Sequence, residues 1–120
     1  MAQTLQNTAI TAIATYLNST YLGSAIGEGL TAISPADTTL EGEAMRVAST
    51  NTLVTTTVTN DTAQMTGTFA ITSSLNIAKA AQFTTSTTGG TMLCEASFSA
   101  LPLVNGDTII TIWKLPVSGS

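Results

Sequence analysis

The most constraining feature of this sequence is a series of short segments, from Tyr21 onward, in which apolar and polar residues alternate. Alternation with a period of two places the apolar side chains on one face of a β-strand. Residues that favour turns separate the segments, as at Asn60-Asp61 and at the pair Gly89-Gly90, which tolerates positive φ. The pattern therefore predicts an antiparallel β-fold.

The alternation predicts about seven strands, at residues 21–29, 44–50, 52–59, 63–71, 79–85, 91–98 and 108–115. Short strands with frequent turn signals are typical of a sandwich or a small barrel, and we favour an antiparallel β-sandwich. A chain of 120 residues is long enough for one domain with its own core. We expect a single domain, 1–120, in which residues 1–20 form an N-terminal helical segment and residues 21–120 form the mainly β sandwich.

Residues 4–17 have a convincing helical period. Thr4 is the predicted N-cap, and Asn18-Ser19-Thr20 is expected to end the helix. A helix of this length with few charges is marginal alone in water, so its apolar stripe should pack on the sheet of this chain or on a neighbouring subunit. The stripe, which we predict to be an interface, consists of Leu5, Ala9, Ile10, Ile13, Tyr16 and Leu17.

The last predicted strand, 108–115, is apolar on both faces. Such a strand lies either centrally between two layers or beneath a partner. We therefore predict that Ile110, Ile112 and Trp113 are interface or core residues. For Trp113, the sole tryptophan, a role as core anchor is favoured over ligand stacking.

Charged residues make up 8% of the chain, histidine is absent, and threonine takes about a fifth of the positions. Catalysis at neutral pH usually needs ionisable groups that converge on one point, so the composition argues against an enzyme. We predict no catalytic residue, no cofactor and no nucleic-acid partner, since phosphate binding depends on clustered Lys and Arg and the net charge is −4. The sequence has no apolar run of transmembrane length and no basic start of a signal peptide, so we expect no membrane contact.

The single cysteine and one acidic loop leave alternatives open. Cys94 is predicted to be a small apolar side chain in a strand, with an intermolecular disulfide or a reactive thiol as the alternatives. Asp37, Glu41 and Glu43 are the only acidic residues that cluster in the sequence. We favour a solvated loop or one paired with Arg46, and a structural cation such as Ca²⁺ is the alternative.

Several short motifs follow one another between residues 21 and 115. They are Ile26-Gly27-Glu28-Gly29, Asp37-Thr38-Thr39-Leu40, Glu43-Ala44-Met45-Arg46, Gly89-Gly90-Thr91-Met92-Leu93 and Thr108-Ile109-Ile110-Thr111-Ile112. Taken together, this order resembles a family of small structural proteins from the virions of tailed bacteriophages. The segment 79–83 departs from the family pattern, which is often more acidic there and contains glycine.

The resemblance implies a virion component without enzymatic activity, assembled in the cytoplasm of the host bacterium. A surface poor in charge and rich in threonine suits a capsid decoration or cement protein that binds and stabilises the phage head. We expect a homo-oligomer, with a trimer favoured, bound to the major capsid protein. The alternative is a tail component, such as an adaptor, a tail-tip subunit or a fibre-attachment subunit, bound to other tail proteins.

Overall fold

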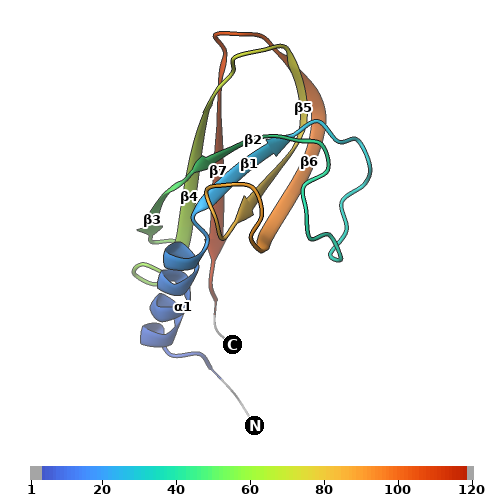
Figure 1. Cartoon of the computed structure of the whole chain (residues 1–120). Coiled ribbons are helices and arrows are strands. Elements are labelled where there is room, and N and C mark those ends of the chain that lie inside the picture. The colour runs from blue at the N-terminus through green and yellow to red at the C-terminus, as the bar shows by residue number, and fades with distance from the viewer. Residues whose placement is uncertain (1–3, 119–120) are drawn as a thin grey trace.

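A computed structural model describes residues 4–118 and shows a mainly β fold with an N-terminal helix (Figure 1). The described residues form seven strands in two antiparallel sheets, which confirms the predicted sandwich. The elements are α1 (Asn7–Thr20), β1 (Gly23–Gly27), β2 (Glu43–Ala48), β3 (Thr50–Val54), β4 (Thr62–Ala70), β5 (Leu75–Phe83), β6 (Met92–Leu103) and β7 (Thr108–Pro116).

Sheet A has the strand order β2-β1-β5-β6, and sheet B has the order β3-β4-β7. The chain crosses from sheet B to sheet A between β4 and β5, and it returns between β6 and β7. These two connections meet at the top of Figure 1, where the Ile71 amide donates to the Asp107 carbonyl and the Gly106 amide donates to the Ile71 carbonyl, both at 2.8 Å. The two sheets are thus tied together at that end.

The main core cluster lies between the sheets and contains Ile26, Phe69, Ile71, Ile77 and Ala80. A second cluster contains Ala25, Leu40, Ala81 and Phe83. Because neighbouring residues of a strand point to opposite faces, Ala25 and Ile26 belong to different clusters. The segment 28–42 therefore covers the outer face of sheet A through Leu40. This cover explains why every residue of β1 is buried.

The two sheets come into close contact where β1 crosses β4. A Cβ atom added to Gly67 would lie 2.5 Å from the Cβ atom of Ser24 and 2.7 Å from its hydroxyl oxygen. Nonbonded carbon atoms do not approach so closely, so residue 67 has no room for a side chain unless β1 moves. Glycine at this position of the strand therefore allows the sheets to pack at their observed spacing.

Helix α1 begins later and ends later than the sequence predicted. Gln6, and not Thr4, is the N-cap residue, and its side chain makes no capping hydrogen bond. The helix continues through Thr20 because its last turn finds partners in the fold. The Asn51 amide donates to the Asn18 carbonyl at 2.8 Å, and the Tyr21 backbone amide donates to the Leu17 carbonyl at 3.0 Å. These bonds satisfy carbonyls that a helix end otherwise leaves unpaired.

The largest differences between the predicted and observed strand boundaries concern β3, β5 and β6. β3 ends at Val54 because the Asp61 carboxylate binds the backbone amides of the following residues and bends the chain. β5 begins at Leu75, before the predicted start at 79, and β6 continues to Leu103 through Pro102. Proline is tolerated there because β6 is an edge strand, where an amide hydrogen is not required on the outer side.

Candidate functional site

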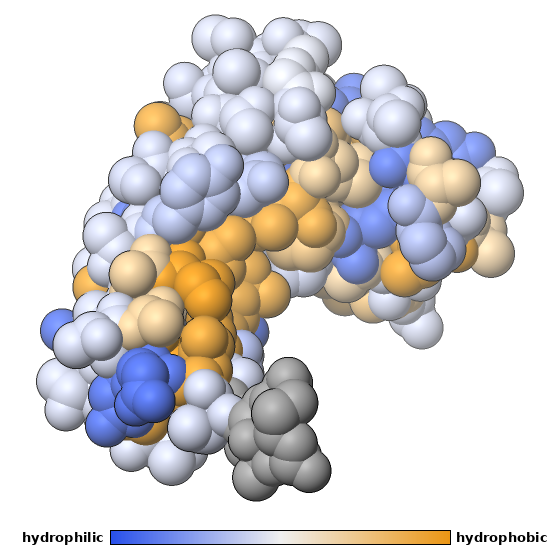
Figure 2. All heavy atoms as spheres, turned by 90° about the horizontal axis from the view of Figure 1, so that it is seen from below, coloured by the Kyte–Doolittle hydropathy of each residue, from blue (hydrophilic) through white to orange (hydrophobic). Residues whose placement is uncertain are grey.

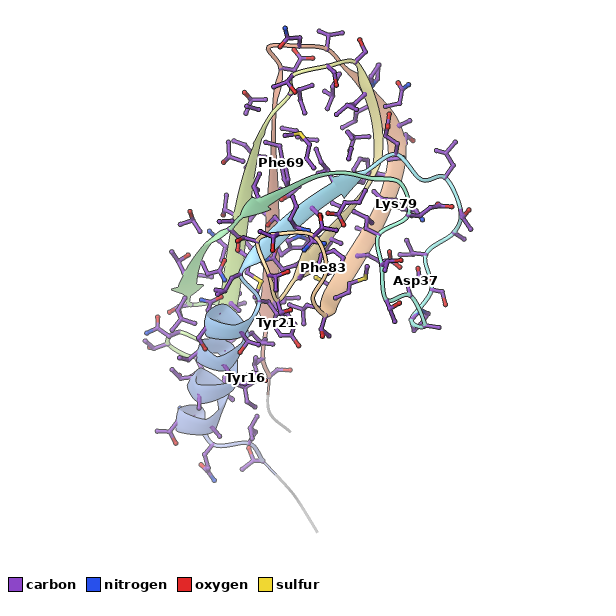
Figure 3. The ribbon with its side chains drawn as sticks, viewed as in Figure 1. Tyr16, Tyr21, Asp37, Phe69, Lys79 and Phe83 are labelled. Carbon is purple, nitrogen blue, oxygen red and sulfur yellow. The ribbon has the colours of Figure 1, made fainter. Side chains whose placement is uncertain are left out.

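The buried charge of Lys79 serves to hold segment 28–42 on sheet A. The Lys79 side chain is only 3% exposed, and its Nζ atom lies 3.0 Å from Oε1 of Glu41 (Figure 3). The hydroxyl and backbone amide of Thr31 also donate to Glu41, at 2.7 and 2.9 Å. The Thr31 hydroxyl and the Lys79 ammonium lower the pKa of Glu41 to about 2. This ion pair is therefore a structural contact and not a free acid or base.

Arg46 organises the turn between β5 and β6. Its guanidinium makes a two-point contact with Glu43, through bonds of 2.9 and 3.0 Å, and stacks 3.8 Å from the ring centre of Phe83. Its Nη1 atom also donates to the carbonyls of Thr85, Thr87 and Gly89, at 3.0, 2.7 and 3.0 Å. All of these partners lie within the chain, so Arg46 is occupied by the fold.

Asp37 and Glu95 form a carboxyl pair beside a hollow of about 320 Å³. The Ser34 amide donates to Oδ2 of Asp37 at 3.0 Å. A hydrogen bond from the Glu95 carboxyl lowers the pKa of Asp37, whereas burial and the neighbouring Asp37 raise the pKa of Glu95. The two carboxyl groups therefore shift each other's pKa in opposite directions. The hollow is lined by Ile33, Ser34, Pro35, Asp37, Met92, Leu93, Cys94 and Glu95.

The ionisable groups in and near this hollow are buried or paired within the fold. Burial raises the pKa of the Cys94 thiol to about 12, which leaves almost no thiolate at neutral pH. The three acidic residues of the loop do not converge, because Asp37 faces Glu95, Glu41 faces Lys79 and Glu43 faces Arg46. Within residues 4–118, no three acidic or cysteine side chains form a group that could hold a metal ion.

A chain of buried hydrogen bonds joins α1 to both sheets. The Ser24 hydroxyl donates to Oε1 of Gln82 at 2.6 Å, and the Gln82 amide donates to the Tyr21 carbonyl and the Ser49 hydroxyl, at 3.0 and 2.9 Å. Ser49 in turn donates to Oδ1 of Asn51 at 2.6 Å. Gln82 and Ser24 are fully buried. These polar groups are engaged in stabilising the fold and are not available to a partner.

The predicted helix stripe is divided between the core and the surface. Ile10 is 3% exposed and packs into the fold together with Ala14, which the sequence analysis did not select. Leu5, Ala9 and Leu17 are half-buried. Ile13 and Tyr16 remain 41% and 61% exposed. Ile10 is therefore unavailable to a partner, and the accessible part of the stripe is Ile13 and Tyr16 (Figure 3 labels Tyr16).

Strand β7 does not lie between two layers, so that alternative is wrong. Within residues 4–118 it pairs with β4 alone and forms an edge of sheet B. Trp113 faces inward and packs against the main core cluster, as the core interpretation predicted. Ile110 and Ile112 point outward, with exposed fractions of 57% and 56%. No described residue covers these two side chains, and the other alternative, a covering partner, stays a prediction.

Further apolar side chains are exposed that the sequence analysis did not single out. They are Leu22, Leu30, Ile33, Phe98, Leu101 and Val104. Seen from below, apolar side chains also gather in a hollow of the molecule (Figure 2). The low content of charged residues was the signal in the sequence for exposed apolar side chains, but it did not indicate where on the fold they lie.

The sequence matches no protein-family model, and it matches no curated protein. In the described part of the chain, the helix is too short to cross a membrane. The exposed apolar side chains are therefore the structural feature that bears most directly on function.

Proposed function

We propose that this chain is a non-enzymatic structural protein of a tailed-phage virion, most simply a capsid decoration or cement protein. The observation that supports this proposal best is the set of exposed apolar side chains on a surface with few charges. A monomer that stays in solution usually keeps such side chains scattered among charged residues. A shell component instead covers them with neighbouring subunits.

The ionisable groups support a structural role over a catalytic one. Lys79 and Arg46 are bound within the fold, and the Cys94 thiol has a pKa too high for a nucleophile at neutral pH. Hydroxyl groups of threonine and serine can form hydrogen bonds across an interface without the large cost of burying a charge. The resemblance to small virion proteins identifies the kind of assembly in which such a surface is used.

The first test is the number of copies of this protein in purified virions, measured by quantitative mass spectrometry against the major capsid protein. A copy number similar to that of the major capsid protein is expected for a decoration protein. A few copies per particle would refute the decoration role and place the protein on the tail. Absence from the virion would refute the structural role itself.

The second test asks whether the exposed helix surface contacts the capsid. The helix cannot be deleted for this purpose, because Ile10 and Ala14 belong to the core. A double variant, I13E/Y16E, changes the exposed apolar residues and is expected to abolish binding to capsids that lack the protein. The matched control, A12E/T15E, adds the same charges at exposed helix positions and is expected to bind as the wild type does. Equal binding by both variants would exclude this surface as the contact.

A further inference from the structure

We propose that β7 pairs edge to edge with β7 of a second copy of this chain, across a two-fold axis at Thr111. The inference rests on the exposed strand and does not depend on the virion role. It replaces the trimer that the sequence favoured with a dimer, because two identical strand edges pair across a two-fold axis. β7 spans nine residues, and one of its edges is unpaired within residues 4–118. Its ladder with β4 runs from Thr62 to Ala70 without a register shift. A long, regular and exposed apolar edge is a template for pairing with another strand.

The other edge strands are less suited to this role. β2 carries Glu43 and Arg46, which bind one another, and its register shifts at the end next to Gly27. β3 has five residues, and β6 has two register shifts against β5 and contains Pro102. Charges, short length, bulges and proline are the devices that protect strand edges from association. β7 has none of these before Lys114 and Pro116 at its end.

The sequence of β7 is self-complementary in an antiparallel pair centred on Thr111. In this register Ile110 faces Ile112 of the second copy, and Ile112 faces its Ile110. On the opposite face, Ile109 lies across from Trp113. Directly opposed apolar side chains stabilise an antiparallel pair. The two exposed isoleucines would therefore cover each other, which the isolated chain does not achieve.

The charges on β7 are compatible with pairing between identical strands. Lys114 is the single charged residue of β7, and it faces Thr108 of the second copy in this register. The two lysines are then six residues apart along the strand, or about 20 Å at roughly 3.4 Å per residue. This separation exceeds the Debye length of about 8 Å at physiological salt, so their repulsion is screened. A single strand pair lies at the low end of the roughly 1,200–2,000 Å² of stable interfaces, so we expect dissociation on dilution.

The test measures the mass of the full-length protein in solution by light scattering during gel filtration. At about 100 μM, above the micromolar range expected for a small interface, the wild type should have twice the chain mass of 12.3 kDa. The variant I110K/I112K should have the mass of one chain at the same concentration. The control T50K/T52K carries the same charges on the opposite edge of sheet B and should remain a dimer.

The outcomes of this test decide the proposal. A monomeric wild type, a trimer, or a control that dissociates as the I110K/I112K variant does would each overturn it. The register is tested with I110C and I112C, each in a C94S background, because both positions are exposed. A disulfide is expected when the two variants are mixed and not when either is alone, since only residues 110 and 112 stand opposite. The copy number in virions does not depend on whether the isolated protein forms a dimer. The mass measurement therefore tests the pairing of β7, and the copy number tests the virion role.

Discussion

Gln82 is the residue at which the buried hydrogen bonds between the elements can be tested most directly. Its side chain is fully buried and makes three hydrogen bonds, to Ser24, Tyr21 and Ser49. Methionine has a similar volume and no polar group that could replace them. The substitution Gln82→Met therefore removes the hydrogen bonds while it creates little cavity.

The expected loss in the free energy of unfolding follows from the groups that are left without a hydrogen-bond partner. After Gln82→Met, the Tyr21 carbonyl still accepts a bond from Asn51, and the Ser49 hydroxyl still donates to Asn51. Only the Ser24 hydroxyl loses the partner that it has in the described structure. An unsatisfied buried group costs about 1–3 kcal/mol, and the imperfect fit of methionine adds up to about 1.5 kcal/mol. We expect a loss of about 2–4 kcal/mol, against a total stability of roughly 5–15 kcal/mol for a domain.

Urea unfolding of four variants, Q82M, Q64M, S24A and S24A/Q82M, tests this prediction. Q82M should lower the free energy of unfolding by the amount above, and the control Q64M, at a half-buried position on β4, should change it by less than about 0.5 kcal/mol. In the double variant S24A/Q82M no hydroxyl remains unpaired, so part of the loss should be recovered. The network interpretation would be refuted if Q82M and Q64M had equal effects, or if S24A destabilised the Q82M protein as much as the wild type.

Four further predictions concern single positions. The Glu41 carboxylate, whose pKa is lowered from 4.5 to about 2, stabilises the fold above pH 4.5 and loses this effect as the pH falls toward 2. In the variant E41Q, the midpoint of urea unfolding should therefore fall less between pH 4.5 and 2 than it does in the wild type. Unchanged acid dependence would show that Glu41 does not hold its loop. R46K should speed amide hydrogen exchange in residues 84–91, because lysine cannot make the several hydrogen bonds through which arginine holds this turn. Equal exchange rates in R46K and the wild type would show that Arg46 does not hold the turn. G67A should destabilise the fold by about 1–3 kcal/mol in thermal unfolding, whereas T68A should be neutral; equal effects would contradict the close sheet contact. Iodoacetamide should modify Cys94 much faster in urea than in the folded protein, and equal rates would show that the thiol is not protected.

Much of the secondary structure could be predicted because strand faces depend on neighbouring residues. The alternation Met65, Gly67, Phe69 and Ile71 identified one face of β4 before the structure placed its buried residues inward. The predicted ends of β3 and α1 were wrong because side chains outside these elements determine where they end. The end of β3 depends on the Asp61 carboxylate, and the end of α1 depends on the Asn51 side chain. Neither contact can be read from the periodicity of the element that it ends.

The candidate interaction surface could be predicted only in part. Helical periodicity identified the apolar stripe, but the rotation of α1 against the sheets decided that Ile10 is buried and Tyr16 is exposed. The pairs Lys79–Glu41 and Asp37–Glu95 join residues far apart in the sequence, and no local pattern links them. For this reason the acidic loop was compatible with a cation site until its partners were known.

The sequence by itself determined the class of fold and the small number of ionisable groups in the chain. Alternation sets which residues share a strand face, and scarcity of charge leaves few groups for catalysis. The tertiary structure decided what covers each face. Ile112 and Ile26 are equally apolar, yet Ile26 faces the core between the sheets and Ile112 points outward from sheet B, so only Ile112 is exposed. Strand order results from the burial of segments that are distant in the chain, and therefore no local pattern could specify it.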